Sequence, residues 1–159
     1  MVLIPFLSEL SENKEFLLKT FLSDQELVDL VSGKKGHAIP ATDLRYTQVY
    51  PVAWVDGTVS EAKTFVCFDI DVNSVSNIAV KNCDIFIWIF THKKFIFTQN
   101  GILIDLIASR VDELINGSTE LGFGKVKLET ALRWSPNSDY YGRVLKYSVQ
   151  DWNRFGARL

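Results

Sequence analysis

The sequence is poor in the residues that build most metal, redox and nucleophilic sites. Its 159 residues include only two cysteines and two histidines. Two cysteines are too few for a disulfide scaffold, so a reduced, cytosolic chain is expected. A zinc site assembled from Cys67, Cys83 and His92 would lack both a fourth ligand and a Cys-x-x-Cys pair. Small buried thiols therefore explain the two cysteines better, and His37 in its polar loop is better explained as a solvated side chain.

A strong charge of either sign and a long apolar run are also missing. The formal net charge of −2 does not indicate general nucleic-acid binding, which usually shows as a basic patch. No apolar run approaches the roughly 20 residues of a membrane span, so we expect no membrane partner. The apolar start of the chain has no basic residue before it and polar residues soon after it, so a signal peptide is not expected.

The feature that stands out is an unbroken apolar run of six residues, Ile85 to Phe90. A half-buried strand would alternate apolar with polar side chains, and this run does not. It therefore predicts a central strand whose two faces are both covered.

The rest of the chain shows helical and strand periodicities in alternation. The order is helix, three strands, helix and terminal strands, which predicts an α+β fold with a mixed, mostly antiparallel sheet and helices packed on it. We expect one domain over residues 1–159, with a helical segment at about 11–32, a sheet-and-helix core at about 45–150 and a mobile tail at 151–159. The expected helices span residues 12–31 and 102–115, and the expected strands span 46–55, 62–72, 78–90, 125–134 and 143–149.

Local signals refine two of these elements. The sequence Ser23-Asp24-Gln25-Glu26 matches a capping box, which predicts a break at Ser23 and a second short helix over 24–31. The apolar stripe of the first helix is expected to be Phe16, Leu17, Phe21 and Leu22. Asp56-Gly57 predicts a turn joining strands 46–55 and 62–72 as a hairpin, with Pro51 favouring an edge position.

Three carboxylates are the strongest candidate for chemistry. Asp69 and Asp71 share one face of their strand and Asp84 begins the next, an arrangement that can hold Mg²⁺ for phosphodiester hydrolysis. The element order is also that of the restriction-enzyme-like nucleases. That family requires an acid-x-Lys triplet, however, and here no lysine follows Asp84 until Lys93. A solvated sheet face accounts for the aspartates equally well.

A set of aromatic and arginine side chains is a candidate protein interface, because Trp, Tyr and Arg are enriched at such contacts. Ordinary packing at the ends of the sheet is an equally good explanation of this set. The candidate interface residues are Trp88, Arg133, Trp134, Tyr140, Tyr141, Arg143 and Trp152.

Several segments together resemble small head-tail joining proteins of tailed bacteriophages, with the tail terminator, or tail-completion, proteins as the nearest fold analogy. The similarity covers roughly residues 45–155. The segments that carry it are 65–72 (FVCFDIDV), 86–93 (FIWIFTHK), 111–118 (VDELINGS), 121–125 (LGFGK), 139–147 (DYYGRVLKY) and 151–154 (DWNR).

The resemblance implies a structural protein without enzymatic activity or cofactors. Members of that group form a hexameric ring that caps the tail tube and docks onto the head connector, with DNA passing through the lumen without sequence-specific binding. The implied location is the neck of a virion assembled in the bacterial cytoplasm. Another neck protein, or a non-viral adaptor, remains an alternative. In a ring, a neighbouring subunit is expected to provide the second cover of the strand that contains Trp88.

Overall fold

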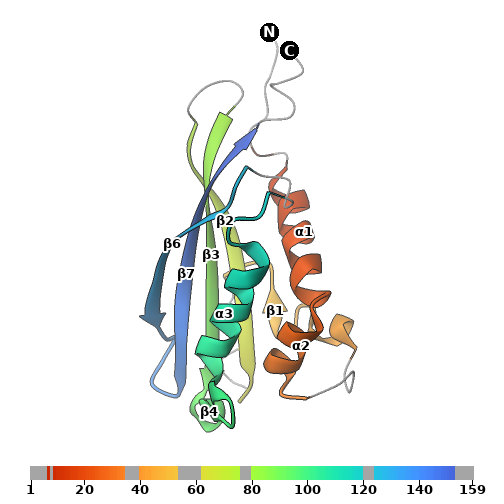
Figure 1. Cartoon of the computed structure of the whole chain (residues 1–159), viewed down its shortest axis with the longest axis vertical. Helices are drawn as coiled ribbons and strands as arrows, with labels where there is room; N and C mark the ends of the chain where they lie inside the picture. Colours follow the sequence, from red (N-terminus) through yellow and green to blue (C-terminus); the bar gives the residue numbers. More distant parts are fainter. Residues whose placement is uncertain are drawn as a thin grey trace.

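The structure, a computed structural model, describes residue 7 and residues 9–34, 40–53, 62–75, 80–119 and 124–152. It confirms the α+β class, with a five-stranded sheet in the order β1-β2-β3-β7-β6 and a separate two-stranded β4–β5 hairpin. Figure 1 shows the arrangement. The elements are α1 (Leu10–Leu22), α2 (Gln25–Ser32), β1 (Val49–Tyr50), β2 (Thr64–Val75), β3 (Val80–His92), β4 (Phe97–Thr98), β5 (Gly101–Ile102), α3 (Leu103–Ile115), β6 (Lys127–Trp134) and β7 (Tyr140–Trp152).

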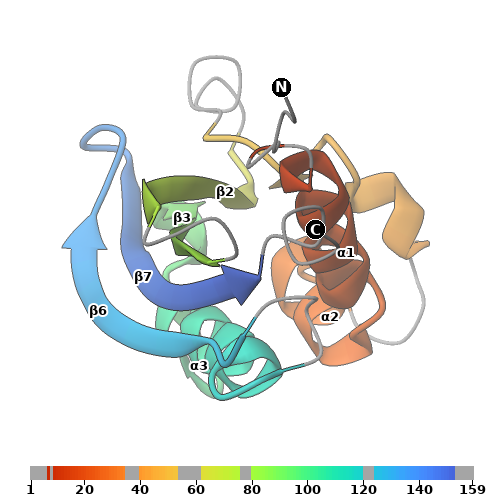
Figure 2. The ribbon, with the colours of Figure 1, turned by 90° about the horizontal axis from the view of Figure 1, so that it is seen from above.

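The strand around the apolar run is central, as predicted. β3 pairs in antiparallel fashion with β2 on one side and with β7 on the other. β6 adds antiparallel to β7 as the edge strand, and both curve strongly in Figure 2. β7 continues to Trp152, two residues into the expected tail, and the remainder of that tail lies outside the described residues.

The predicted hairpin of strands 46–55 and 62–72 is wrong. β1 has only two residues and runs parallel to β2, with Val49 opposite Val66. Pro51 follows at once and has no N–H to continue the pairing, which limits the length of the strand. The expected turn at Asp56-Gly57 lies outside the described residues.

The first two helices follow the predicted break, with differences at their ends. Asp24, not Ser23, caps α2, because its carboxylate accepts a hydrogen bond from the Leu27 N–H at 2.9 Å. In α1 the buried side is formed by Leu17, Leu18 and Phe21, so the predicted stripe is rotated and Phe16 is left 46% exposed. None of the described helices is long and apolar enough to cross a membrane.

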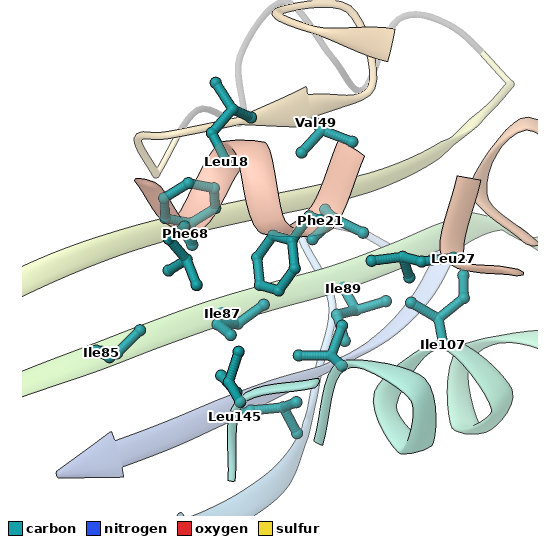
Figure 3. Close-up of a cluster of buried hydrophobic side chains, with 14 of the residues drawn as sticks. Leu18, Phe21, Leu27, Val49, Phe68, Ile85, Ile87, Ile89, Ile107 and Leu145 are labelled. Atoms are coloured by element: carbon teal, nitrogen blue, oxygen red, sulfur yellow. The ribbon is translucent and has the colours of Figure 1, made fainter. Parts of the chain in front are cut away.

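The main core lies between the three helices and one face of the sheet (Figures 1 and 3). Alternate residues of β3, namely Ile85, Ile87 and Ile89, are fully buried there against α1, α2 and α3. β2 and β7 add residues by the same alternation, as their sequences predict. These are Val66, Phe68 and Ile70 from β2, and Leu145, Tyr147 and Val149 from β7.

Candidate functional site: the open face of the sheet

The side chains between the core positions project to the other side of the sheet, which we call the open face. Its central residue is Trp88, which lies opposite Cys67 of β2 and Val144 of β7. The buried cluster on this face consists of strand residues alone, whereas all three helices contribute to the main core. The prediction that both faces of β3 are covered is therefore right for the helix side and only partly right for the open face, where Phe86 and Trp88 stay half-exposed.

One end of the open face is a packed group of aromatic rings. Phe90 is its centre, with ring centroids 5.2 Å from Phe65, 5.5 Å from Trp134 and 5.8 Å from Tyr140. His92 packs edge-on against Tyr140 at 5.4 Å. Edge-to-face pairs of this kind fix ring orientations beyond what burial alone achieves. This end of the face is thus a rigid aromatic platform drawn from four strands.

Gly142 makes that platform possible. It lies between Phe90 of β3 and Trp134 of β6 in the register of the sheet. A Cβ at this position would collide with the carbonyl oxygen of Ile89 and would lie 2.8 Å from the Cβ of Phe90. The missing side chain lets Phe90 cross the gap and reach Trp134. A glycine interrupting a regular strand alternation was the available sequence signal for this contact.

The middle of the open face is apolar and half-exposed. The rings of Phe86 and Trp88 stack with centroids 5.8 Å apart and planes 20° apart. The ammonium group of Lys146 lies 5.9 Å from the Phe86 ring centroid, a cation–π contact. Leu132 on the edge strand β6 is 58% exposed and lies opposite Val144. A strip of large apolar side chains left partly in water is typical of a protein contact surface.

Asp69, Asp71 and Asp84, the residues of the nuclease alternative, do share this face, but they contact different partners. Asp71 and Asp84 are cross-strand partners. Asp84 accepts a hydrogen bond from the Asn73 amide at 2.8 Å, and Asp69 forms an ion pair with Lys14 at 2.6 Å. Within the described ranges, no group of three His, Cys, Asp or Glu side chains is placed to hold a metal ion. The arrangement fits a polar sheet margin better than a two-metal site.

The sheet separates the two cysteines that a zinc site would have needed. Cys67 belongs to the open-face cluster, whereas Cys83 belongs to the main core behind β3. Both thiols are buried. Their positions on opposite faces fit the interpretation as small packing residues.

Three of the candidate interface residues meet on the open face: Trp88, Trp134 and Tyr140. They extend the apolar strip from the middle of β3 to the aromatic platform. Sequence reasoning missed Phe86, Leu132 and Gly142, since their roles depend on strand register.

The other candidates do not join this group. Tyr141 packs against the main core, and the guanidinium of Arg143 donates to Asp105 of α3 at 2.6 Å, which raises the pKa of Arg143. Arg133 lies opposite Arg143 and therefore on the helix side of the sheet. The side chain of Trp152 lies outside the described part of the chain.

Comparison with known proteins gives a match to a family model and matches to solved structures. A family model described as YomW matches residues 18–149. A chain of the solved structure "Virion of native gene transfer agent (GTA) particle" aligns with a TM-score of 0.56 and 15% sequence identity, covering 87% of this chain and 93% of that chain. At this identity the similarity shows a shared fold. No curated protein sequence matches the chain.

Proposed function

The chain belongs to the YomW family, and from its fold and its open aromatic face we propose that it is a structural protein of a phage or phage-derived virion. The fold is shared with a chain of a gene transfer agent virion, almost over its whole length. The observation that carries the proposal is the half-exposed strip around Trp88, because large apolar side chains left partly in water are typical of a protein contact surface. Among the described residues, no group of three His, Cys, Asp or Glu side chains is placed to hold a metal ion.

Within the virion we propose the role of a tail terminator at the head-tail junction. In this role the copies form a ring, expected to be a hexamer, that caps the tail tube protein and docks onto the head connector, while DNA passes through the lumen. The element order and the motifs between residues 65 and 154 support this choice among neck proteins. The open face is then buried against the adjacent layer of the neck.

The energetics of the open face favour burial. Stable protein contacts bury roughly 800 Å² per partner, and their free energy is concentrated in a few central aromatic residues. Phe86 and Trp88 are already stacked, and Phe90 is fixed by its neighbours. Because these rings are ordered before binding, little side-chain entropy is lost when a partner covers them.

Leu132→Asp tests the proposal at an exposed position on this face. We expect the variant to fold, because Leu132 is 58% exposed, and to enter purified particles at least about tenfold less than the wild type. Ser109→Asp, on the exposed side of α3, introduces the same charge on the helix side and should be incorporated normally. The readout is quantitative immunoblotting of particles from cells that express each variant. Normal incorporation of Leu132→Asp would exclude the open face as the contact.

We propose in addition that the chain is not an enzyme. Incubation with duplex DNA and Mg²⁺ or Mn²⁺ is expected to leave the DNA intact. Cleavage that Asp84→Ala abolishes would contradict this and restore the nuclease alternative.

A further inference from the structure

The β4–β5 hairpin presents an exposed aromatic side chain. Phe97 is 82% exposed, and Ile102 opposite it and Phe95 before it are exposed as well. The hairpin lies below α3 in Figure 1, at the opposite end of the molecule from the start of α1. An apolar tip of this kind is costly in water, at about 25 cal/mol for each Å² of apolar surface.

This hairpin is held in place by its own hydrogen bonds. The Thr98 hydroxyl donates to the Gly101 carbonyl oxygen at 2.8 Å and accepts from the Asn100 N–H at 3.2 Å. The Leu103 N–H donates to the Ile96 carbonyl oxygen at 2.9 Å, which joins the hairpin to the start of α3. The tip is therefore a preorganised knob, and docking it loses little backbone entropy.

A recess of about 410 Å³ lies on the outer side of the helices. Its apolar part is Phe16 of α1, which is 46% exposed, together with Leu114 of α3. Polar residues complete its lining: Lys19, Thr20, Ser23 and Asp24. The recess is shallow and opens widely to solvent.

Next to Asp24, at the edge of this recess, carboxylates outnumber cations. Arg110 contacts Asp24 at 2.5 Å, Glu113 at 2.7 Å and Glu26 at 3.4 Å. The three carboxylates of Asp24, Glu26 and Glu113 exceed the single positive charge of Arg110 by two. The net charge of this group, the acidic rim, remains negative when Lys19 is added. The base of the hairpin is positively charged, because Lys93 and Lys94 precede it in the chain. Lys94 there forms no ion pair with any described residue, while Lys93 binds Asp139 at 3.0 Å.

We propose that the Phe97 knob of one copy of the chain docks into the Phe16–Leu114 recess of a second copy, with Lys94 facing the acidic rim. The apolar tip of the hairpin then covers Phe16 and Leu114, and Lys94 lies near the carboxylates around Arg110. The inference rests on the self-association in the proposed function and names the surfaces that perform it.

Knob and recess are different surfaces of the same chain, so the contact is head-to-tail. Each copy uses its knob on one neighbour and offers its recess to another. Contacts of this class close into rings when the rotation between copies allows it. A self-complementary twofold contact would instead stop at a dimer, which a neck ring excludes.

Mixing two single variants tests the contact. Phe97→Asp removes the knob, and Phe16→Asp removes the recess, both at exposed positions where folding should be unaffected. By sedimentation velocity, each variant alone should need at least about tenfold more protein than the wild type to assemble. In an equimolar mixture, the intact knob of one variant can enter the intact recess of the other. The mixture should therefore form one-to-one dimers that grow no further, and Ser109→Asp should assemble like the wild type.

Several results would overturn the contact: either variant assembling at the wild-type concentration, a mixture that stays monomeric, or a wild-type chain that stays monomeric throughout. The virion assignment is judged separately, by the presence of the chain in purified particles. Failure of the contact and failure of the proposed function are thus distinguishable.

Discussion

At the scale of single residues, Asp24 joins two helices through one carboxyl group. The carboxylate caps α2 through the Leu27 N–H and binds Arg110 of α3 through both oxygens. The Arg110 guanidinium holds the pKa of Asp24 below its usual range. Asn is as good a helix cap as Asp, so Asp24→Asn removes the charge that pairs with Arg110 and keeps the cap. Asp24→Ala removes both the ion pair and the cap.

We expect the unfolding free energy of Asp24→Ala to be about 0.5–2 kcal/mol lower than that of Asp24→Asn, because this is the usual effect of removing a helix cap. The pKa of Asp24 is lowered in the folded state. Its ion-pair contribution is therefore complete above the ordinary carboxyl pKa of about 4 and is lost as the pH falls through the folded value. The stability difference between wild type and Asp24→Asn should shrink between pH 6 and pH 3 in urea titrations. A difference that stays constant over that range contradicts the assignment.

Tyr147 makes the stability depend on pH at the alkaline end, as Asp24 does at the acidic end. Its ring is fully buried and its hydroxyl donates to Asp112 at 2.8 Å, and burial raises the pKa of the phenol. A raised pKa means that its contribution is complete below the ordinary value of about 10 and is lost as the pH rises above it. Tyr147→Phe should cost about 0.5–1.5 kcal/mol at pH 7 and should lose stability less steeply than the wild type above pH 10. Parallel pH profiles in guanidinium unfolding would show that Tyr147 is not the responsible group.

At the scale of elements, β7 depends on the absence of a side chain at Gly142. A Cβ there meets the backbone of β3, which cannot move without breaking the ladder. Gly142→Ala should destabilise the chain by about 1–3 kcal/mol and should separate Phe90 from Trp134. Thr130→Ala, on the exposed part of β6, should stay within about 0.5 kcal/mol. Thermal unfolding followed by tryptophan fluorescence reports both effects, and equal stability of the two variants contradicts the steric argument.

The long elements could be predicted from the sequence because their own periodicity defines them. α3 and the core side of β7 follow from apolar positions that recur regularly, and β3 follows from its unbroken apolar run. The two-residue β1 carries no such signal, and its parallel pairing depends on the path of the preceding chain. Propensity likewise placed the cap of α2 one residue early, because Ser23 and Asp24 are both good caps and only Asp24 reaches Arg110.

The candidate site was less predictable than the fold, since it depends on which strands become neighbours. Residue types alone identified Trp88, Trp134 and Tyr140, which meet on the open face. The same criterion also selected Arg143, whose partner Asp105 is 38 residues away in the chain. Gly142 and Leu132 acquire their roles only through cross-strand register.

At the scale of the whole molecule, one face of the sheet is covered by the helices and the other face is open. The helix side contains the main core, and the open face leaves ordered aromatic rings partly in water. Such a division is expected of a subunit that completes its burial by assembly. The hairpin knob and the helical recess extend this description to the contact between copies.

The central claim is that this chain is a virion component at the head-tail junction. Electron cryo-microscopy of purified particles that carry it tests this most directly, with the chain identified by the shape of its five-stranded sheet and three helices. The account predicts a closed ring of copies between the tail tube and the head, with Trp88 buried against a neighbouring protein. Particles that lack the chain, or that hold it with the Trp88 face in solvent, would contradict the account.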